Sequence, residues 1–127
     1  MEFEDKRKKK DIFEYKRKKD IVARKIIADN LINKNPDKIP VIVEKDPTSR
    51  ISGMNKSRFL VEKKSTVNKF ILEIKELIKM KEEEAVFLTA RGKYSLSGSK
   101  FFEDIYKSYK DEDGFLYIMY STELMFG

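Results

Sequence analysis

The chain contains no cysteine and no histidine among its 127 residues. Without cysteine, a disulfide framework, a thiol nucleophile and a thiolate metal site are all excluded. Without histidine, the commonest metal ligand and the usual general base at neutral pH are missing as well. We therefore expect no metal site and no cofactor.

Long apolar runs are also missing. No stretch approaches the roughly 20 apolar residues that a membrane-spanning helix needs, and residues 1–10 lack the apolar core of a signal peptide. The sequence thus predicts a cytoplasmic protein whose membrane contacts come from its surface or from an added lipid. Hydrophobic residues make up 40% of the chain, which suits one globular domain with a single core.

Positive charge is concentrated at one end of the chain. Residues 1–25 hold eleven Lys and Arg against six Asp and Glu, and so carry most of the net charge of +6. An aromatic residue followed by a basic run occurs there twice, beginning at Phe3 and at Phe13. Such runs are most often solvated, although they also suit acidic lipid headgroups, tubulin tails or nucleic acid. We assign residues 1–12 to a basic N-terminal extension and residues 13–127 to the domain.

Capping residues and turn signals divide the domain into helices and strands. Asp11 with Glu14 is expected to open a first helix, and Asp20 a second. The later elements expected are strands over 39–45 and 58–61, an amphipathic helix opened by Thr66, a strand over 86–90, a short helix over 101–109 and a strand over 115–121.

The order of these elements defines the fold class. They form no alternating strand-helix-strand series, so an α+β sheet with a helix across one face is expected. This arrangement fits a ubiquitin-like β-grasp with two additional N-terminal helices.

Gly127 ends the sequence and suggests a function. A terminal carboxylate can be adenylated, passed to an enzyme's cysteine as a thioester and then given to an amine. Because glycine has no side chain, it lets the tail enter a narrow active-site tunnel with little steric conflict. The ending is therefore typical of a conjugated modifier.

Three segments carry a resemblance to a known family. Residues 36–45, 58–61 and 110–117 resemble the autophagy ubiquitin-like modifiers, which include the GABA-receptor-associated protein and the microtubule-associated light chain. The similarity runs from about Phe13 to Gly127. It implies a β-grasp fold with two N-terminal helices, in agreement with the order of elements above.

The resemblance implies that the protein is a substrate of a conjugation cascade. A processing and deconjugating cysteine protease, an activating enzyme and a conjugating enzyme would act on it and link Gly127 to phosphatidylethanolamine. The protein would then lie in the cytoplasm and, as a lipid-anchored peripheral protein, on the autophagosome membrane.

The resemblance also implies binding of cargo-receptor peptides that carry an aromatic-x-x-aliphatic motif. The peptide would add a strand beside residues 58–61. Its aromatic side chain would enter a pocket made by Ile27, Leu31, Pro40, Arg58, Leu60 and Phe115. Its aliphatic side chain would enter a second pocket made by Phe59, Val61 and Phe70. Glu62, Ser65 and Glu73 stand where the family usually has apolar residues or proline, so we expect weaker or altered peptide binding.

Two other functional classes remain open. An unconjugated basic module for microtubules, acidic membranes or nucleic acid is the main alternative. An enzyme is least favoured, because no phosphate-cradling glycine loop or nucleophile elbow occurs and the carboxylates of Glu82, Glu83 and Glu84 form a charge run of the usual solvated kind.

Overall fold

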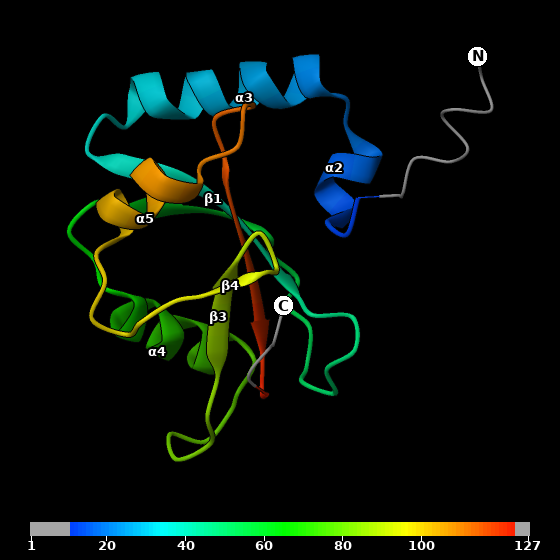
Figure 1. Ribbon diagram of the computed structural model, residues 1–127, viewed down its shortest axis with the longest axis vertical. Helices are drawn as coiled ribbons and strands as arrows, with labels where there is room; N and C mark the ends of the chain where they lie inside the picture. The colour runs from blue at the N-terminus through cyan, green and yellow to red at the C-terminus, as the bar shows by residue number, and fades with distance from the viewer. Residues whose placement is uncertain (1–10, 124–127) are drawn as a thin grey trace.

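The computed structural model describes residues 11–123, and Figure 1 shows their arrangement. The elements are α2 (Glu14–Lys18), α3 (Ile21–Lys34), β1 (Lys38–Lys45), β2 (Arg58–Glu62), α4 (Val67–Leu77), β3 (Phe87–Ala90), β4 (Tyr94–Ser95), α5 (Phe102–Tyr109) and β5 (Leu116–Ser121). All the expected helices and strands are present, with boundaries close to those predicted. The two-residue strand β4 was not predicted.

Two of the three predicted capping residues cap their helices. The side chain of Asp20 accepts a hydrogen bond from Ala23 N at 2.9 Å, and Thr66 accepts one from Lys69 N at 3.2 Å. The predicted capping box of Asp11 with Glu14 is wrong, because α2 begins only at Glu14. Asp11 instead accepts from Phe13 N at 3.0 Å and fixes the turn before the helix.

The centre of the molecule is a five-stranded sheet in the order β2-β1-β5-β3-β4. β1 pairs in parallel with β5, whereas β2 is antiparallel to β1 and β3 is antiparallel to β5. All six residues of β5 are buried. A strand that is buried on both faces needs a layer on each side of the sheet.

Helices supply both layers. α4 and α5 pack on the face that carries Val41, Leu88 and Ile118, and together they form the main core. α3 packs on the opposite face, where Ala28 contacts the smaller core around Ile42. Alternate residues of β1 and β5 thus point into different cores, as the period of two in a strand requires.

A tight loop between α5 and β5 brings the last strand under α3. Gly114 has a φ of +95°, which an L side chain rarely adopts, and a Cβ added there would lie 3.1 Å from the Cβ of Ala28. Glycine is needed here both for its backbone conformation and for the close approach of the helix.

A buried carboxylate ties α3 to the same loop. Asp113, only 1% exposed, accepts hydrogen bonds from Arg24 Nε at 2.9 Å, Tyr117 Oη at 2.6 Å and Phe115 N at 2.8 Å. Arg24 also donates to the carbonyl oxygens of Lys16 and Lys19 at the end of α2. This set of bonds joins α2, α3 and β5 through one ion pair.

The architecture confirms the predicted fold class. A mixed sheet is crossed by α4 on one face, and two helices precede the first strand. The fold is therefore an α+β, ubiquitin-like β-grasp with two additional N-terminal helices.

The buried ion pair gives a first prediction. Asp113→Ala leaves the charge of Arg24 buried without its partner, and we expect the free energy of unfolding to fall by about 3–5 kcal/mol. Asp104→Ala removes an exposed carboxylate on α5 and should change it by less than about 0.5 kcal/mol. Urea unfolding of both variants measures the difference, and equal stabilities would contradict this role for Asp113.

Candidate functional site

Strand β2 lies at one edge of the sheet. Its residues pair with β1 on one side only, from Arg58 opposite Ile42 to Glu62 opposite Lys38. Its other side presents N–H and C=O groups that an added strand can pair with. Exposed and buried side chains alternate along β2, so its two faces differ in character.

The six residues predicted for the aromatic pocket come together on the α3 side of the sheet. Pro40 on β1 is paired with Leu60 on β2, and Ile27 and Leu31 of α3 pack against the smaller core that contains Phe115. Leu60 is 36% exposed, whereas Phe115 is fully buried. Leu60 is therefore the exposed part of this group, and Phe115 lies in its interior.

Arg58 stands at the start of β2 and is exposed. It is paired with Ile42 of the smaller core, so it lies on the same side of the sheet as Leu60. Its guanidinium is placed to attract a carboxylate on a strand added at this edge.

The three residues predicted for the aliphatic pocket lie in the main core instead. Phe59 and Val61 are each 5% exposed, and Phe70 on α4 is 1% exposed. The rings of Phe59 and Phe70 pack edge to face with centroids 5.5 Å apart. These side chains form the interior beneath any pocket between β2 and α4.

The surface above them is polar. Glu62 and Glu73 are exposed, and Ser65 is 7% exposed, with its carbonyl accepting a hydrogen bond from Phe102 N. Because alternate residues of β2 face opposite sides of the sheet, Glu62 lies with Leu60 on the α3 side, which leaves Glu73 as the exposed carboxylate on the α4 side.

Helix α2 is held to the body of the protein by a carboxylate from β1. Glu44 accepts hydrogen bonds from Glu14 N at 2.8 Å and Tyr15 N at 3.0 Å, which satisfies two free amides at the helix start. A five-residue helix is too short to be stable alone. Its position therefore depends on these tertiary contacts and on Phe13, which is 3% exposed in the smaller core.

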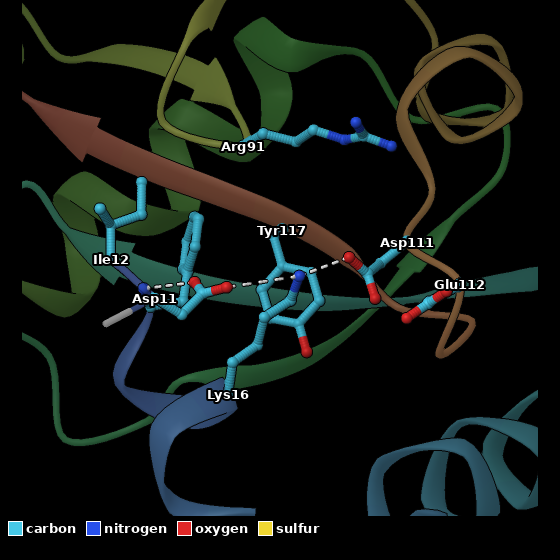
Figure 2. Close-up of a pocket in the computed structure, with 8 residues that line it drawn as sticks. Asp11, Ile12, Lys16, Arg91, Asp111, Glu112 and Tyr117 are labelled. Carbon is cyan, nitrogen blue, oxygen red and sulfur yellow. Dashed lines mark hydrogen bonds and ion pairs between the residues drawn. The ribbon is translucent and has the colours of Figure 1, made fainter. Parts of the chain in front are cut away.

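A cleft of about 580 Å³ lies beside α2, and Figure 2 shows the side chains that line it. The Nζ atom of Lys16 lies 2.5 Å from Asp111 Oδ1 and 3.7 Å from Asp11 Oδ2. It also lies 4.7 Å from the centroid of the Tyr117 ring. Arg91 extends along the opposite wall and donates to the backbone carbonyls of Tyr109 and Lys110.

The charges in this cleft alter two pKa values. Partial burial acts to raise the pKa of Asp111, but hydrogen bonds from Lys16 and the backbone N–H of Asp113, with the charges of Lys16 and Arg24, outweigh it and hold the pKa below its usual value. Burial, followed by the hydrogen bond to Asp113, raises the pKa of Tyr117. The polar side chains of this cleft thus form hydrogen bonds and ion pairs with one another. This arrangement suits holding α2 in place rather than proton transfer.

Within residues 11–123, no group of three or more Asp or Glu side chains is arranged to hold a metal ion. No helix in this part of the chain has the length and apolar character needed to cross a bilayer.

Some predicted features lie outside the described residues. Gly127 is one of them, and of the predicted basic extension only Asp11 and Ile12 are described.

Sequence reasoning missed the residues that position α2, namely Glu44, Lys16, Asp111, Arg24 and Asp113. The sequence held one sign that Arg24 is buried. Arg24 lies four residues before Ala28, so the two residues share the buried face of α3. The partners of Lys16 and Glu44 are 95 and 30 residues distant, and no local pattern indicates them.

Comparison with known proteins gives a consistent result. The model of the family described as "Autophagy protein Atg8 ubiquitin like" matches residues 23–127. The chain is 39% identical to autophagy-related protein 8e of Arabidopsis thaliana, with 89% of this chain and 92% of the relative covered. It is 42% identical to autophagy-related protein 8 of Dictyostelium discoideum, with 82% and 85% covered.

Solved structures are similar as well. The crystal structure of Trypanosoma brucei ATG8 matches with a TM-score of 0.82 and 35% identity over 91% of this chain and 98% of that one. Plasmodium falciparum Atg8, solved in complex with a Plasmodium falciparum Atg3 peptide, matches with a TM-score of 0.77 and 26% identity over 87% and 97%.

The ion pair of Lys16 gives a second prediction. Because the folded-state pKa of Asp111 is lowered, its stabilising contribution is complete above the ordinary pKa and is lost as pH falls through the folded value. We expect hydrogen-exchange protection of the Arg17 and Lys19 amides, which donate to the backbone carbonyls of Phe13 and Tyr15, to drop as the pH falls below about 5.

Two variants test the assignment. Asp111→Asn should weaken this protection at neutral pH and reduce its further loss in acid. Asp37→Asn changes an exposed carboxylate and should leave the wild-type curve intact. If Asp111→Asn and the wild type follow the same curve, the ion pair does not hold α2.

Proposed function

Since this chain belongs to the Atg8 family of ubiquitin-like autophagy proteins, we propose that it is a modifier conjugated through Gly127 to phosphatidylethanolamine. The observation that carries the proposal is that the family match extends through residue 127 and so includes the terminal glycine. The protein is then the substrate of a conjugation cascade and not itself an enzyme.

The proposed partners are those of such a cascade. They are an activating enzyme, a conjugating enzyme and a processing and deconjugating cysteine protease. The Plasmodium relative was solved with an Atg3 peptide, which supports a contact between proteins of this fold and other autophagy proteins. No metal or cofactor is part of the proposal.

Lipid conjugation would give the protein a membrane anchor, since residues 11–123 contain no helix that could span a bilayer. Each buried methylene contributes about 0.8 kcal/mol, so the two acyl chains of a phospholipid anchor stably where one chain binds marginally. We propose that the unconjugated protein is cytoplasmic and that the conjugate lies on the autophagosome membrane, where it acts in autophagosome formation. Residues 1–12 would form a basic extension outside the domain of residues 13–127.

The second part of the proposed function is peptide capture at the edge of β2. The free edge, the exposed Leu60 and the α3 residues Ile27 and Leu31 support an added strand whose aromatic side chain enters between β2 and α3. Phe59, Val61 and Phe70 would be the floor of the aliphatic pocket, reached by movement of α4 away from β2. The exposed Glu73 of α4 would make that pocket weaker for an aliphatic side chain, whereas Glu62 lies on the α3 side of β2.

Conjugation gives the third prediction. In a reaction with cognate activating and conjugating enzymes, ATP and phosphatidylethanolamine liposomes, the wild type should gain the mass of one lipid, whereas Gly127→Ala should remain unmodified. Gly53→Ala is a matched control, since a Cβ at Gly53 meets no atom within 4 Å. A lipid adduct on Gly127→Ala, or none on the wild type with active enzymes, would refute the conjugation proposal.

Peptide binding gives the fourth prediction. Leu60→Ala should weaken the binding of an aromatic-x-x-aliphatic peptide about tenfold, because a partly exposed leucine becomes buried under the aromatic side chain. Leu77→Ala, at an exposed leucine near the end of α4, should leave the affinity unchanged. Glu73→Leu should strengthen binding.

Isothermal titration of the four proteins compares these affinities. Equal affinities for Leu60→Ala and Leu77→Ala would argue against the aromatic pocket. No gain with Glu73→Leu would argue against the position of the aliphatic one.

A further inference from the structure

The outer edge of β2 carries a pattern of charge. Its exposed side chains are, in order along the strand, Arg58, Leu60 and Glu62. Their pairing with β1 and the alternation of side chains place all three on the α3 side of the sheet. A cation, an apolar side chain and a carboxylate thus follow one another at alternate positions.

The same three residues carry the backbone groups of β2 that face outward. At the two ends of the strand pair, Val43 N donates to Ser57 O at 2.8 Å and Lys63 N donates to Asp37 O at 3.2 Å. Hydrogen-bonded and non-hydrogen-bonded pairs alternate along antiparallel strands, so the even-numbered residues of β2 direct their N–H and C=O groups away from β1. An added strand would therefore pair with the residues whose side chains are exposed.

The free edge ends at Glu62. The carbonyl oxygen of Glu62 accepts a hydrogen bond from Ser65 N at 3.0 Å, in the turn that leads to α4. The N–H of Glu62 is then the last outward donor of β2. The residue of an added strand that lies opposite Glu62 is therefore the last one in the ladder.

The spacing of the two peptide pockets fixes the register of a parallel added strand. The aliphatic residue of an aromatic-x-x-aliphatic peptide follows the aromatic one by three positions, so the two side chains lie on opposite faces of the sheet. Within β2, this step joins one pair of residues, Arg58 on the α3 side and Val61 on the α4 side. The aromatic residue therefore lies opposite Arg58, and the aliphatic residue lies opposite Val61.

An antiparallel strand fits the pockets less well. Its aliphatic residue would reach Phe59 only if the aromatic residue lay opposite Glu62, beyond Leu60 and beside a carboxylate. The parallel register keeps the aromatic residue next to Leu60. It also puts the residue that directly follows the aliphatic one opposite Glu62, with its side chain on the same face.

Glu62 is placed to select the charge of that residue. Within residues 11–123, no ion pair involves Glu62, although Lys38 lies opposite it on β1. Residues directly opposite on neighbouring strands have Cβ atoms about 5 Å apart, whereas Lys38 and the peptide residue would be separated by two strand spacings, or about 9.6 Å. That separation exceeds the screening length of about 8 Å at physiological salt. A basic peptide residue therefore gains more from Glu62 than it loses to Lys38.

We propose that Glu62 determines the specificity of the β2 edge and selects peptides in which lysine or arginine directly follows the aliphatic residue. The partner is then a segment of the form aromatic-x-x-aliphatic-basic. This inference rests on the proposed peptide capture and names the class of peptide that is captured. Glu62 is one of the positions at which the sequence departs from the family resemblance, so this selection belongs to the present chain.

The test compares three peptides with blocked ends. Each contains aspartate, tryptophan, serine, valine and leucine in that order, followed by lysine, glutamine or glutamate. Each peptide is titrated calorimetrically into the full-length wild type, Glu62→Lys, Glu62→Gln and Glu76→Lys. Glu76→Lys is the matched control, because it makes the same change of charge at an exposed glutamate of α4.

We expect the wild type to bind the lysine peptide about tenfold more tightly than the glutamate peptide, with the glutamine peptide between them. Glu62→Lys should reverse this order, and Glu62→Gln should make the three affinities nearly equal. Glu76→Lys should keep the wild-type order. High salt should reduce the differences, because it screens exposed charges.

Equal affinities of the wild type for the three peptides would overturn the role of Glu62 while leaving peptide capture in place. A reversal with Glu76→Lys as large as that with Glu62→Lys would also overturn it, since net charge alone would then explain the selection. If the folded wild type binds none of the peptides, capture at β2 itself fails, and this inference fails with it. Should Glu62→Lys unfold, Glu62→Gln and the peptide series on the wild type decide the result.

Discussion

The parallel pairing of β1 and β5 is the constraint on which the rest of the structure depends. It places the first and last strands at the centre of the sheet and buries both of their faces. Helices must then cover each face, with α4 and α5 on one side and α3 on the other. β2 is left at an edge of the sheet, where its outer N–H and C=O groups can pair with an added strand.

Much of the fold could be predicted because its causes are local. Asp20 and Thr66 cap helices with their own side chains, and the amphipathic spacing of α4 is visible in its sequence. The strands are dense in β-branched and aromatic residues. β4 was missed because two residues give no periodicity, and Asp11 was misassigned because the burial of Phe13 sets where α2 begins.

The site was less predictable because its contacts join distant parts of the chain. Lys16 belongs to a basic run in the sequence, yet its partner Asp111 lies 95 residues later, after β1, β2, β3 and β4. Glu44 is a polar residue near the end of β1, yet its carboxylate accepts hydrogen bonds from the first two amides of α2. The residues predicted for the aromatic pocket do lie together, whereas Phe59, Val61 and Phe70 are interior side chains of the main core.

The central claim is that the edge of β2, with the face of α3 beside it, is the surface that recognises peptides. Amide chemical shifts of the labelled protein, followed by NMR as an aromatic-x-x-aliphatic peptide is added, test it most directly. The account predicts that the largest changes fall on Arg58–Glu62 and on the residues of α3 that face β2. Changes concentrated on β3 and β4, at the opposite edge, with β2 unaffected, would contradict it.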